Sequence, residues 1–283
     1  MRHEDKTVEG QGGVRCFTQS WLPDGDAVGA VVLCHGYAEH SGRYEHVAAT
    51  LVGAGWAVFA LDHRGHGRSS GNRAVIDNLD AALADLDALV DRATAIPVGA
   101  RPVLLGHSMG GAIAAAYAVR HQDKLSALVC SAPALGMRAT LPAVQRVAMH
   151  ALAALAPNTG TVALDATGVS RDPLVVTAYE ADPLNYHGKV PARTAREMLR
   201  ASDLVAARAQ EVTLPVLIMV GSADRLVPVQ GSRDLAASLG ARDVTLTVYD
   251  GLYHEVFNEP EGDEVLRDLV AWLDIHRPQP TGA

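Results

Sequence analysis

The pentapeptide GHSMG (106–110) holds a serine in a setting that could activate it as a nucleophile. It follows the apolar run VLL and opens the helical pattern MGGAIAAAYAVR, so the serine would sit on a turn between a strand and a helix. Such a turn is so tight that the neighbours of the serine must lack side chains, which explains Gly106 and Gly110. The helix N-terminus favours developing negative charge. We therefore predict that Ser108 is a nucleophile for acyl transfer.

A serine hydroxyl is a weak nucleophile until a base takes its proton, and the chain offers twelve histidines. With a G-x-S-x-G turn, the partners follow the serine in the order Asp or Glu, then His. His254 fits this order, because it lies in the loop DGLYHEVFN before the last predicted helix. His187 comes too early in the chain, and His276, near the end of the last helix, is expected to face solvent. We predict that His254 is the base.

The base must be held in one tautomer by a carboxylate. Asp224 ends the segment PVLIMVGSAD (215–224), directly after the penultimate predicted strand. Asp250 follows the wrong strand, and Asp203 belongs to the end of the inserted cap expected before that strand. A single loop aspartate is usually a turn residue, but the position of Asp224 favours a catalytic role.

Acyl transfer also needs hydrogen-bond donors for the oxyanion. One predicted donor is the backbone N–H of Met109, immediately after the nucleophile. The other is expected in the segment CHGYAEH (34–40), where Gly36 lets the backbone turn and Tyr37 N–H follows. No role is assigned to the Tyr37 side chain.

These residues must be positioned by an alternation of short apolar runs and amphipathic segments. Apolar runs that predict strands are 29–36, 56–62, 101–108, 125–133, 215–224 and 244–251. Most are near-continuous in Val, Leu, Ile or Ala, as in parallel strands covered on both faces. Leu79, Leu83, Leu86, Leu89 and Val90 share one helical face. The pattern predicts the α/β class, with a mostly parallel, doubly wound sheet.

The alternation is interrupted once, between two predicted strands. We expect residues 1–134 and 215–283 to form the α/β core and residues 135–214 to form an inserted helical cap, or lid. An insertion of this length should carry its own helices, and VQRVAMHALAALA (144–156) is one of them. Ligands of open α/β sheets bind at the carboxyl edge, so we expect the cap to cover that edge.

Composition excludes several classes of function. The 283 residues carry a net charge of −8, which gives no support to nucleic-acid binding. The polar N-terminus lacks the core of a signal peptide, and no apolar run reaches the roughly 20 residues of a membrane span. A cytoplasmic or peripherally membrane-associated protein is expected. The three cysteines show no paired or metal-like spacing, and Cys34 and Cys130 lie in or at the end of apolar runs, which indicates buried thiols.

Asp62, His63 and His66 could suggest a metal site, but their glycine-rich surroundings favour a structural loop. No metal and no cofactor is therefore expected.

Five segments together resemble the monoacylglycerol lipases, in the lysophospholipase-like or serine aminopeptidase S33-type branch of the α/β-hydrolases, and their bacterial members most. They are HGYAEHSGRY (35–44), DHRGHGRSSG (62–71), GHSMGG (106–111), GSADRLVP (221–228) and YHEVFNEPE (253–261). The resemblance covers nearly the whole chain and implies an α/β-hydrolase fold with a nucleophile elbow. It implies hydrolysis of one fatty acyl ester of glycerol, without metal or cofactor.

The resemblance also implies residues for substrate binding. Glu39 and Arg43 match positions that shape the polar end of the pocket, and ADPLNYHG (181–188) adds Tyr186 and His187. Glu39 and Arg43 are also four residues apart, which would suit a mere surface ion pair worth under ~1 kcal/mol. Mammalian members carry a second histidine three residues after the catalytic one, where this chain has Phe257.

We expect a serine esterase that releases fatty acid and glycerol through an acyl-enzyme. Its partner would be a small lipid, with transient contact between the cap and a membrane or lipid surface. A lysophospholipase or general carboxylesterase would use the same chemistry, and a peptidase would need a carboxylate for the substrate amine. A non-catalytic ligand-binding protein on this scaffold would be expected to lose one of Ser108, Asp224 and His254, and all three are present.

Overall fold

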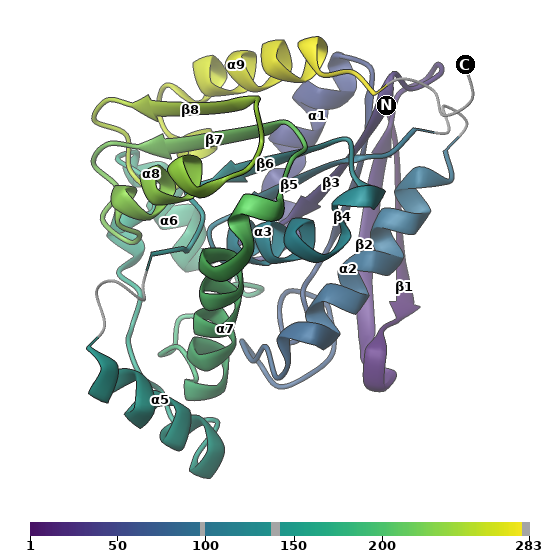
Figure 1. Ribbon diagram of the computed structural model, residues 1–283. Helices are drawn as coiled ribbons and strands as arrows, with labels where there is room; N and C mark the ends of the chain where they lie inside the picture. The colour runs from purple at the N-terminus through teal and green to yellow at the C-terminus, as the bar shows by residue number, and fades with distance from the viewer. Residues whose placement is uncertain (97–99, 137–141, 279–283) are drawn as a thin grey trace.

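The computed structural model describes residues 1–96, 100–136 and 142–278. Its centre is an eight-stranded sheet in the order β1-β2-β4-β3-β5-β6-β7-β8 (Figure 1). The strands are β1 (Arg2–Glu9), β2 (Arg15–Leu22), β3 (Gly29–Cys34), β4 (Trp56–Leu61), β5 (Val103–His107), β6 (Ala127–Ser131), β7 (Val216–Gly221) and β8 (Val244–Tyr249). Strands β3 to β8 are parallel, which confirms the predicted fold class and all six predicted strands.

The sequence did not predict the antiparallel hairpin formed by β1 and β2, which joins the sheet through β4. Strand β1 reads RHEDKTVE and is exposed along almost its whole length, so it shows no apolar alternation. It lies at the edge of the sheet, where charged side chains discourage pairing with other chains. Its strand character comes from pairing with β2 rather than from its own residues.

Helices cover both faces of the sheet (Figure 1). On one face lie α1 (Glu45–Gly53) and α9 (Gly262–Ile275); on the other lie α2 (Leu79–Thr94), α3 (Met109–His121) and α8 (Val229–Ser238). Side chains alternate along each strand: Val31 and Leu33 join the α1 and α9 layer, and Val32 faces α2 and α3. Fully burying one such side chain stabilises the fold by about 1.5–3 kcal/mol. The two layers of buried side chains therefore hold the strand ends in place.

Among the described residues between β6 and β7, the α-helices are α5 (Ala143–Leu155), α6 (Pro173–Ala181) and α7 (Ala192–Arg208). Helix α5 confirms the helix predicted over 144–156. We propose that residues 135–214 form the cap as expected from the sequence, of which 137–141 lie outside the described residues.

Helix α7 is attached to the core through buried polar contacts. The Thr194 hydroxyl accepts from Ile76 N–H at 3.0 Å and donates to the Ala74 carbonyl at 2.9 Å. The carboxylate of Glu197, 1% exposed, accepts from Leu79 N–H at 3.0 Å at the start of α2. Removing a partner would leave a buried group without its hydrogen bond, so these contacts fix the position of α7.

Helix α5 is attached differently, packing mainly against α7. Val144, Val147 and Leu155 on α5 are 79%, 69% and 87% exposed. No helix in the described ranges is both long and apolar enough to cross a membrane.

The described cysteines Cys16, Cys34 and Cys130 are all free and buried, as the sequence predicted. Burial raises the pKa of the Cys130 thiol to about 12, so this side chain stays protonated.

Candidate active site

Ser108 lies between β5 and α3 in a strained turn. Its φ of 54° and ψ of −117° are rare for a residue with a side chain, and such strain costs about 1–3 kcal/mol. A Cβ at Gly106 would lie 2.3 Å from the Gly110 carbonyl oxygen, and one at Gly110 would lie 2.3 Å from that of Cys34. Both glycines are therefore required by the close approach of the turn to neighbouring backbone, and Ser108 stays half-exposed at its tip.

His254 and Asp224 form a hydrogen-bonded pair in two loops that follow β8 and β7. His254 Nδ1 lies 2.8 Å from Asp224 Oδ2, and both side chains are nearly or fully buried. The other oxygen, Asp224 Oδ1, accepts from Leu226 N–H at 2.8 Å and Val227 N–H at 2.9 Å. Burial alone would raise the pKa of Asp224, but these hydrogen bonds and His254 outweigh it and lower the pKa. The carboxylate is therefore ionised at neutral pH and orients His254 with Nε2 free.

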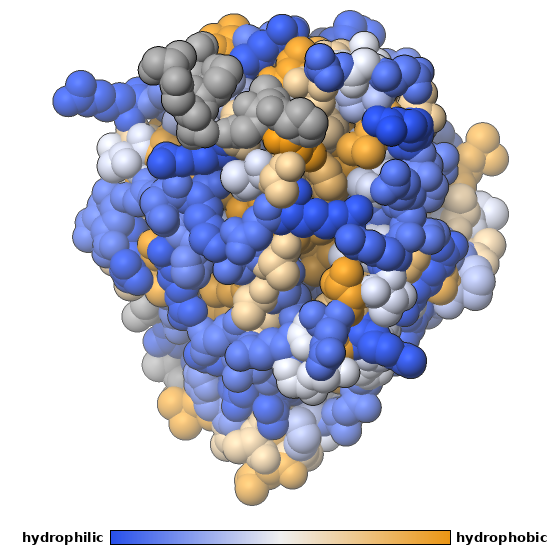
Figure 2. All heavy atoms as spheres, turned by 90° about the vertical axis from the view of Figure 1, so that its right-hand side faces the viewer, coloured by the Kyte–Doolittle hydropathy of each residue, from blue (hydrophilic) through white to orange (hydrophobic). Residues whose placement is uncertain are grey.

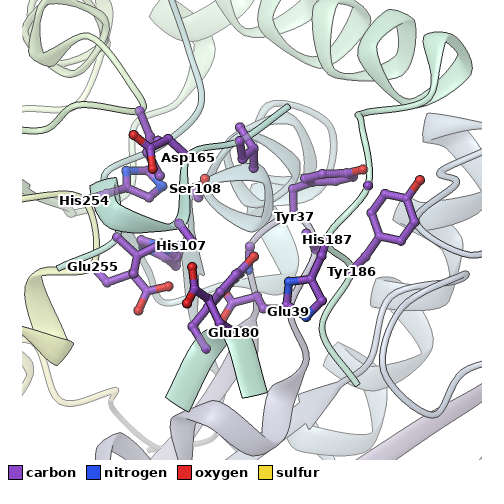
Figure 3. A pocket seen from close by; sticks show the side chains of 18 residues that line it. Tyr37, Glu39, His107, Ser108, Asp165, Glu180, Tyr186, His187, His254 and Glu255 are labelled. Carbon is purple, nitrogen blue, oxygen red and sulfur yellow. Dashed lines mark hydrogen bonds between the residues drawn. The ribbon is translucent and has the colours of Figure 1, made fainter. Parts of the chain in front are cut away.

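Ser108 and His254 line the same cavity of about 250 Å³ (Figure 3). No hydrogen bond joins the Ser108 hydroxyl to His254 in this structure, although both residues are described. Such contacts are often long without substrate and tighten when it binds. The arrangement can move a proton from the serine hydroxyl through His254 Nε2.

Two backbone N–H groups flank Ser108. Tyr37 follows β3, and Met109 is the first residue of α3. Across the described parts of the chain, neither N–H donates to a protein acceptor. Two unused donors beside a nucleophile are the arrangement that stabilises an oxyanion.

Glu39 and Arg43, assigned by resemblance, lie in a buried ion-pair group with Glu255. Arg43 donates to Glu39 at 2.6 Å and to both carboxylate oxygens of Glu255 at 2.7 Å. The alternative of a surface ion pair is wrong, because the Glu39 and Arg43 side chains are only 3% and 11% exposed. Glu39 and Glu255 line the cavity, and Arg43 is not among its lining residues.

The carboxyl groups of this ion-pair group differ in pKa. Burial would raise the pKa of Glu255, but Arg43 outweighs burial and lowers it to about 2. Burial raises the pKa of Glu39, although Arg43 opposes the shift. Sequence reasoning missed Glu255, whose only signal was its place directly after His254.

Residues of the insertion complete the cavity wall. Tyr186 and His187 line it as the resemblance implied, together with Tyr179, Glu180 and Asp165 (Figure 3). Phe257 belongs to the hydrophobic core and is not among the lining residues, so the head-group contact of the mammalian histidine is missing. His276 does not face solvent: it stacks on Trp272 at 3.8 Å and pairs with Asp243 at 2.8 Å.

His107, the variable residue before the serine, was not singled out from the sequence. Its ring lies 4.8 Å from the ring of His254, and its Nδ1 lies 3.1 Å from the Ser131 hydroxyl. Burial, with His254 adding to it, lowers the pKa of His107 to about 3. A neutral ring therefore packs against the predicted base.

His63 and His66 are buried near His35 rather than grouped with acidic ligands. Their pKa values are lowered by burial to about 3 and about 4, so both rings are neutral. Asp62 accepts hydrogen bonds from Ser41 and from the Arg68 backbone within the loop. Over the described residues, no group of three or more His, Cys, Asp or Glu side chains could hold a metal ion.

Comparison with known proteins agrees with this fold. The family model described as "Serine aminopeptidase, S33" matches residues 25–261. A monoacylglycerol lipase of Mycolicibacterium smegmatis is 47% identical over 96% of this chain and 97% of its own. The human monoglyceride lipase is 33% identical over 92% of this chain and 87% of its own. The crystal structure of the Paleococcus ferrophilus monoacylglycerol lipase, 33% identical, covers 92% of this chain and 99% of its own with a TM-score of 0.83.

The parallel sheet and the serine turn define an α/β-hydrolase, and its monoacylglycerol lipase relatives place it among the carboxylic ester hydrolases. Within that class, the chain belongs to the monoacylglycerol lipase family, inside the broader serine aminopeptidase S33 group.

Proposed function

We propose that the enzyme hydrolyses monoacylglycerols to free fatty acid and glycerol, with Ser108, His254 and Asp224 as the catalytic triad. The observation that carries the proposal is one cavity holding Ser108 and the Asp224-bound His254 beside two unused backbone donors. Relatives named as monoacylglycerol and monoglyceride lipases support the choice of ester.

The proposed reaction has two halves. Ser108 Oγ attacks the ester carbonyl while His254 Nε2 takes its proton, and Tyr37 and Met109 N–H groups donate to the oxyanion. The intermediate collapses, the C–O bond to glycerol breaks, and His254 protonates the leaving oxygen. Water, deprotonated by His254, then attacks the acyl-enzyme, the bond between the acyl carbon and Ser108 Oγ breaks, and His254 returns the proton to Ser108 as the fatty acid leaves. We propose Tyr186 and His187, on the opposite wall, as contacts for the glycerol head.

The substrate is tested with monoacylglycerols, diacylglycerols, triacylglycerols, lysophospholipids and short p-nitrophenyl esters on purified enzyme. We expect clear turnover of monoacylglycerols of several chain lengths, because one methylene changes selectivity by only about 10–200-fold. Diacylglycerols should react more slowly and triacylglycerols hardly at all, because a second and a third acyl chain would have to pass the same cavity walls beside Ser108. Faster turnover of lysophospholipids or comparable rates on triacylglycerols would favour the alternative esterases.

The exposed apolar side chains of the cap suit contact with a lipid surface. Val144, Val147 and Leu155 form an exposed apolar patch on α5. Apolar atoms gather at the lower end of the molecule in Figure 2, the end at which Figure 1 places α5. We propose that this apolar patch contacts the surface that holds the substrate.

Changing Val147 and Leu155 together to serine should lower activity on monoacylglycerol in vesicles or emulsions several-fold. Hydrolysis of a water-soluble short ester should stay near the wild-type rate, because neither residue lines the cavity. The matched control is Ile275→Ser, an 81% exposed apolar residue on α9. Equal losses for both substrates, or the same loss in the control, would contradict a role in surface contact.

A further inference from the structure

The segment 36–39, which carries the proposed oxyanion donor Tyr37 N–H, is held from two sides. On one side, the Glu39 carboxylate accepts from Gly36 N–H at 2.6 Å. On the other, the Ala38 carbonyl accepts from Tyr186 N–H at 2.8 Å. Ala38 has a φ of 66°, in the left-handed region that residues with side chains rarely occupy. The segment therefore needs outside contacts to keep its shape.

Contacts within the protein occupy most of the hydrogen-bond acceptor positions of the Glu39 carboxylate. Oε1 accepts from Gly36 N–H and from the Tyr44 hydroxyl at 2.7 Å, and Oε2 accepts from Arg43 at 2.6 Å. A carboxylate has about four acceptor positions, so three are occupied without substrate. A Cβ on Gly36 would lie 2.8 Å from Oε1, which shows how tightly the carboxylate is packed against the backbone.

We propose that Glu39 is a positioning residue that holds the oxyanion donor, rather than a ligand of the glycerol head. The residue fixes Gly36 N–H, and the next N–H along the chain is that of Tyr37. Because neighbouring peptide groups are covalently linked, fixing one of them in this turn also orients the next. Glu39 therefore directs Tyr37 N–H toward the position where the oxyanion forms. Arg43 holds Glu39 in turn and is itself held by both oxygens of Glu255.

The position of Arg43 agrees with this role. Its guanidinium lies 4.8 Å from the centre of the Tyr179 ring and does not line the cavity. A cation that served the glycerol head would have to face the cavity. Arg43 instead neutralises buried carboxylates, and so keeps Glu39 in place behind the oxyanion segment.

The inference rests on the proposed ester hydrolysis but not on the identity of the alcohol. It is tested by Glu39→Gln with p-nitrophenyl butyrate, which carries no glycerol, beside a monoacylglycerol. The amide side chain of this variant has one oxygen for the three groups that donate to the Glu39 carboxylate in the wild type. The segment 36–39 should therefore lose its fixed geometry. We expect kcat to fall about 10–100-fold for both esters, with KM little changed. This loss is smaller than the fall in kcat of about 10²–10³ that follows the complete removal of an oxyanion donor. Affinity for a glycerol-free trifluoromethyl ketone, which mimics the tetrahedral intermediate, should fall by a similar factor.

Two controls separate positioning from misfolding. Active-site titration with a fluorophosphonate counts the folded, reactive enzyme, so that kcat refers to competent molecules alone. Glu197→Gln removes an equally buried carboxylate that lies between α7 and α2, and its kcat per titrated site should equal that of wild type. Tyr44→Phe takes away one of the three donors to Glu39 and should give a smaller loss in the same parameters.

A loss confined to monoacylglycerol and expressed in KM, with p-nitrophenyl butyrate and the ketone unaffected, would overturn the inference and make Glu39 a head-group ligand. Unchanged kinetics on both esters would also overturn it. If monoacylglycerol is not hydrolysed at all, the proposed substrate fails, while the butyrate and ketone measurements still decide the role of Glu39.

Discussion

Ser108→Ala should abolish ester hydrolysis, with a fall in kcat of about 10⁴ or more. Triad members act as a unit, so loss of the nucleophile removes nearly the whole contribution of His254 and Asp224 as well. The fold should persist, because the change removes only the hydroxyl group and leaves the glycines of the turn between β5 and α3 in place. The change is measured as kcat on monoacylglycerol and on p-nitrophenyl butyrate, with thermal unfolding as the check on structure.

Covalent labelling provides a second measurement on the same variant. A fluorophosphonate probe should label the wild-type enzyme once and Ser108→Ala not at all, because the label requires an activated hydroxyl. Ser222→Ala, an exposed serine in the loop after β7, is the matched control and should label normally. Labelling that survives in Ser108→Ala would show that another residue is the nucleophile.

Asp224→Asn should lower kcat by about 10⁴ while the fold is kept, in line with the same change in a serine protease triad. The carboxylate accepts the Nδ1–H of His254 at 2.8 Å, which leaves Nε2 as the acceptor for the serine proton. An asparagine can present its N–H₂ to Nδ1, and this stabilises the tautomer that has its proton on Nε2. The amide oxygen can still accept from Leu226 and Val227 N–H, so the loop should hold its shape.

Asp250→Asn is the control for this prediction. Asp250 is exposed, and within the described part of the chain its carboxylate accepts only from the Ser222 hydroxyl, at 3.1 Å, so its loss should leave kcat near wild type. Kinetics and melting temperature are compared for both variants. An inactive Asp250→Asn beside an active Asp224→Asn would show that the acid had been assigned to the wrong loop.

The sequence predicted the parallel sheet and the three triad positions for a common reason. Near-continuous apolar runs indicate strands buried on both faces, and the carboxyl ends of parallel strands meet at one edge. Ser108, Asp224 and His254 each follow such a run, so chain order alone indicated that they would meet. The structure brings them to one edge of the sheet, with His254 bonded to Asp224 and beside the cavity of Ser108.

The β1–β2 hairpin was missed because β1 is held by pairing with β2 rather than by apolar side chains of its own. Strand β1 is polar and exposed, and nothing in eight residues reading RHEDKTVE distinguishes an edge strand from a polar terminus. The pairing partners, residues 15–22, lie beyond a turn and are themselves rich in polar groups.

The sequence by itself predicted ester hydrolysis, because the serine turn is a local pattern and its two expected partners follow apolar strands in a fixed chain order. Only the tertiary structure decided what surrounds that chemistry. Glu255 lies 212 residues from Arg43, yet both of its carboxylate oxygens accept from Arg43, which also donates to Glu39 beside the oxyanion segment. Which carboxylate an arginine contacts depends on how loops from different strands pack together. This packing leaves the Arg43 side chain only 11% exposed, so the ion pair is buried and supports the oxyanion segment.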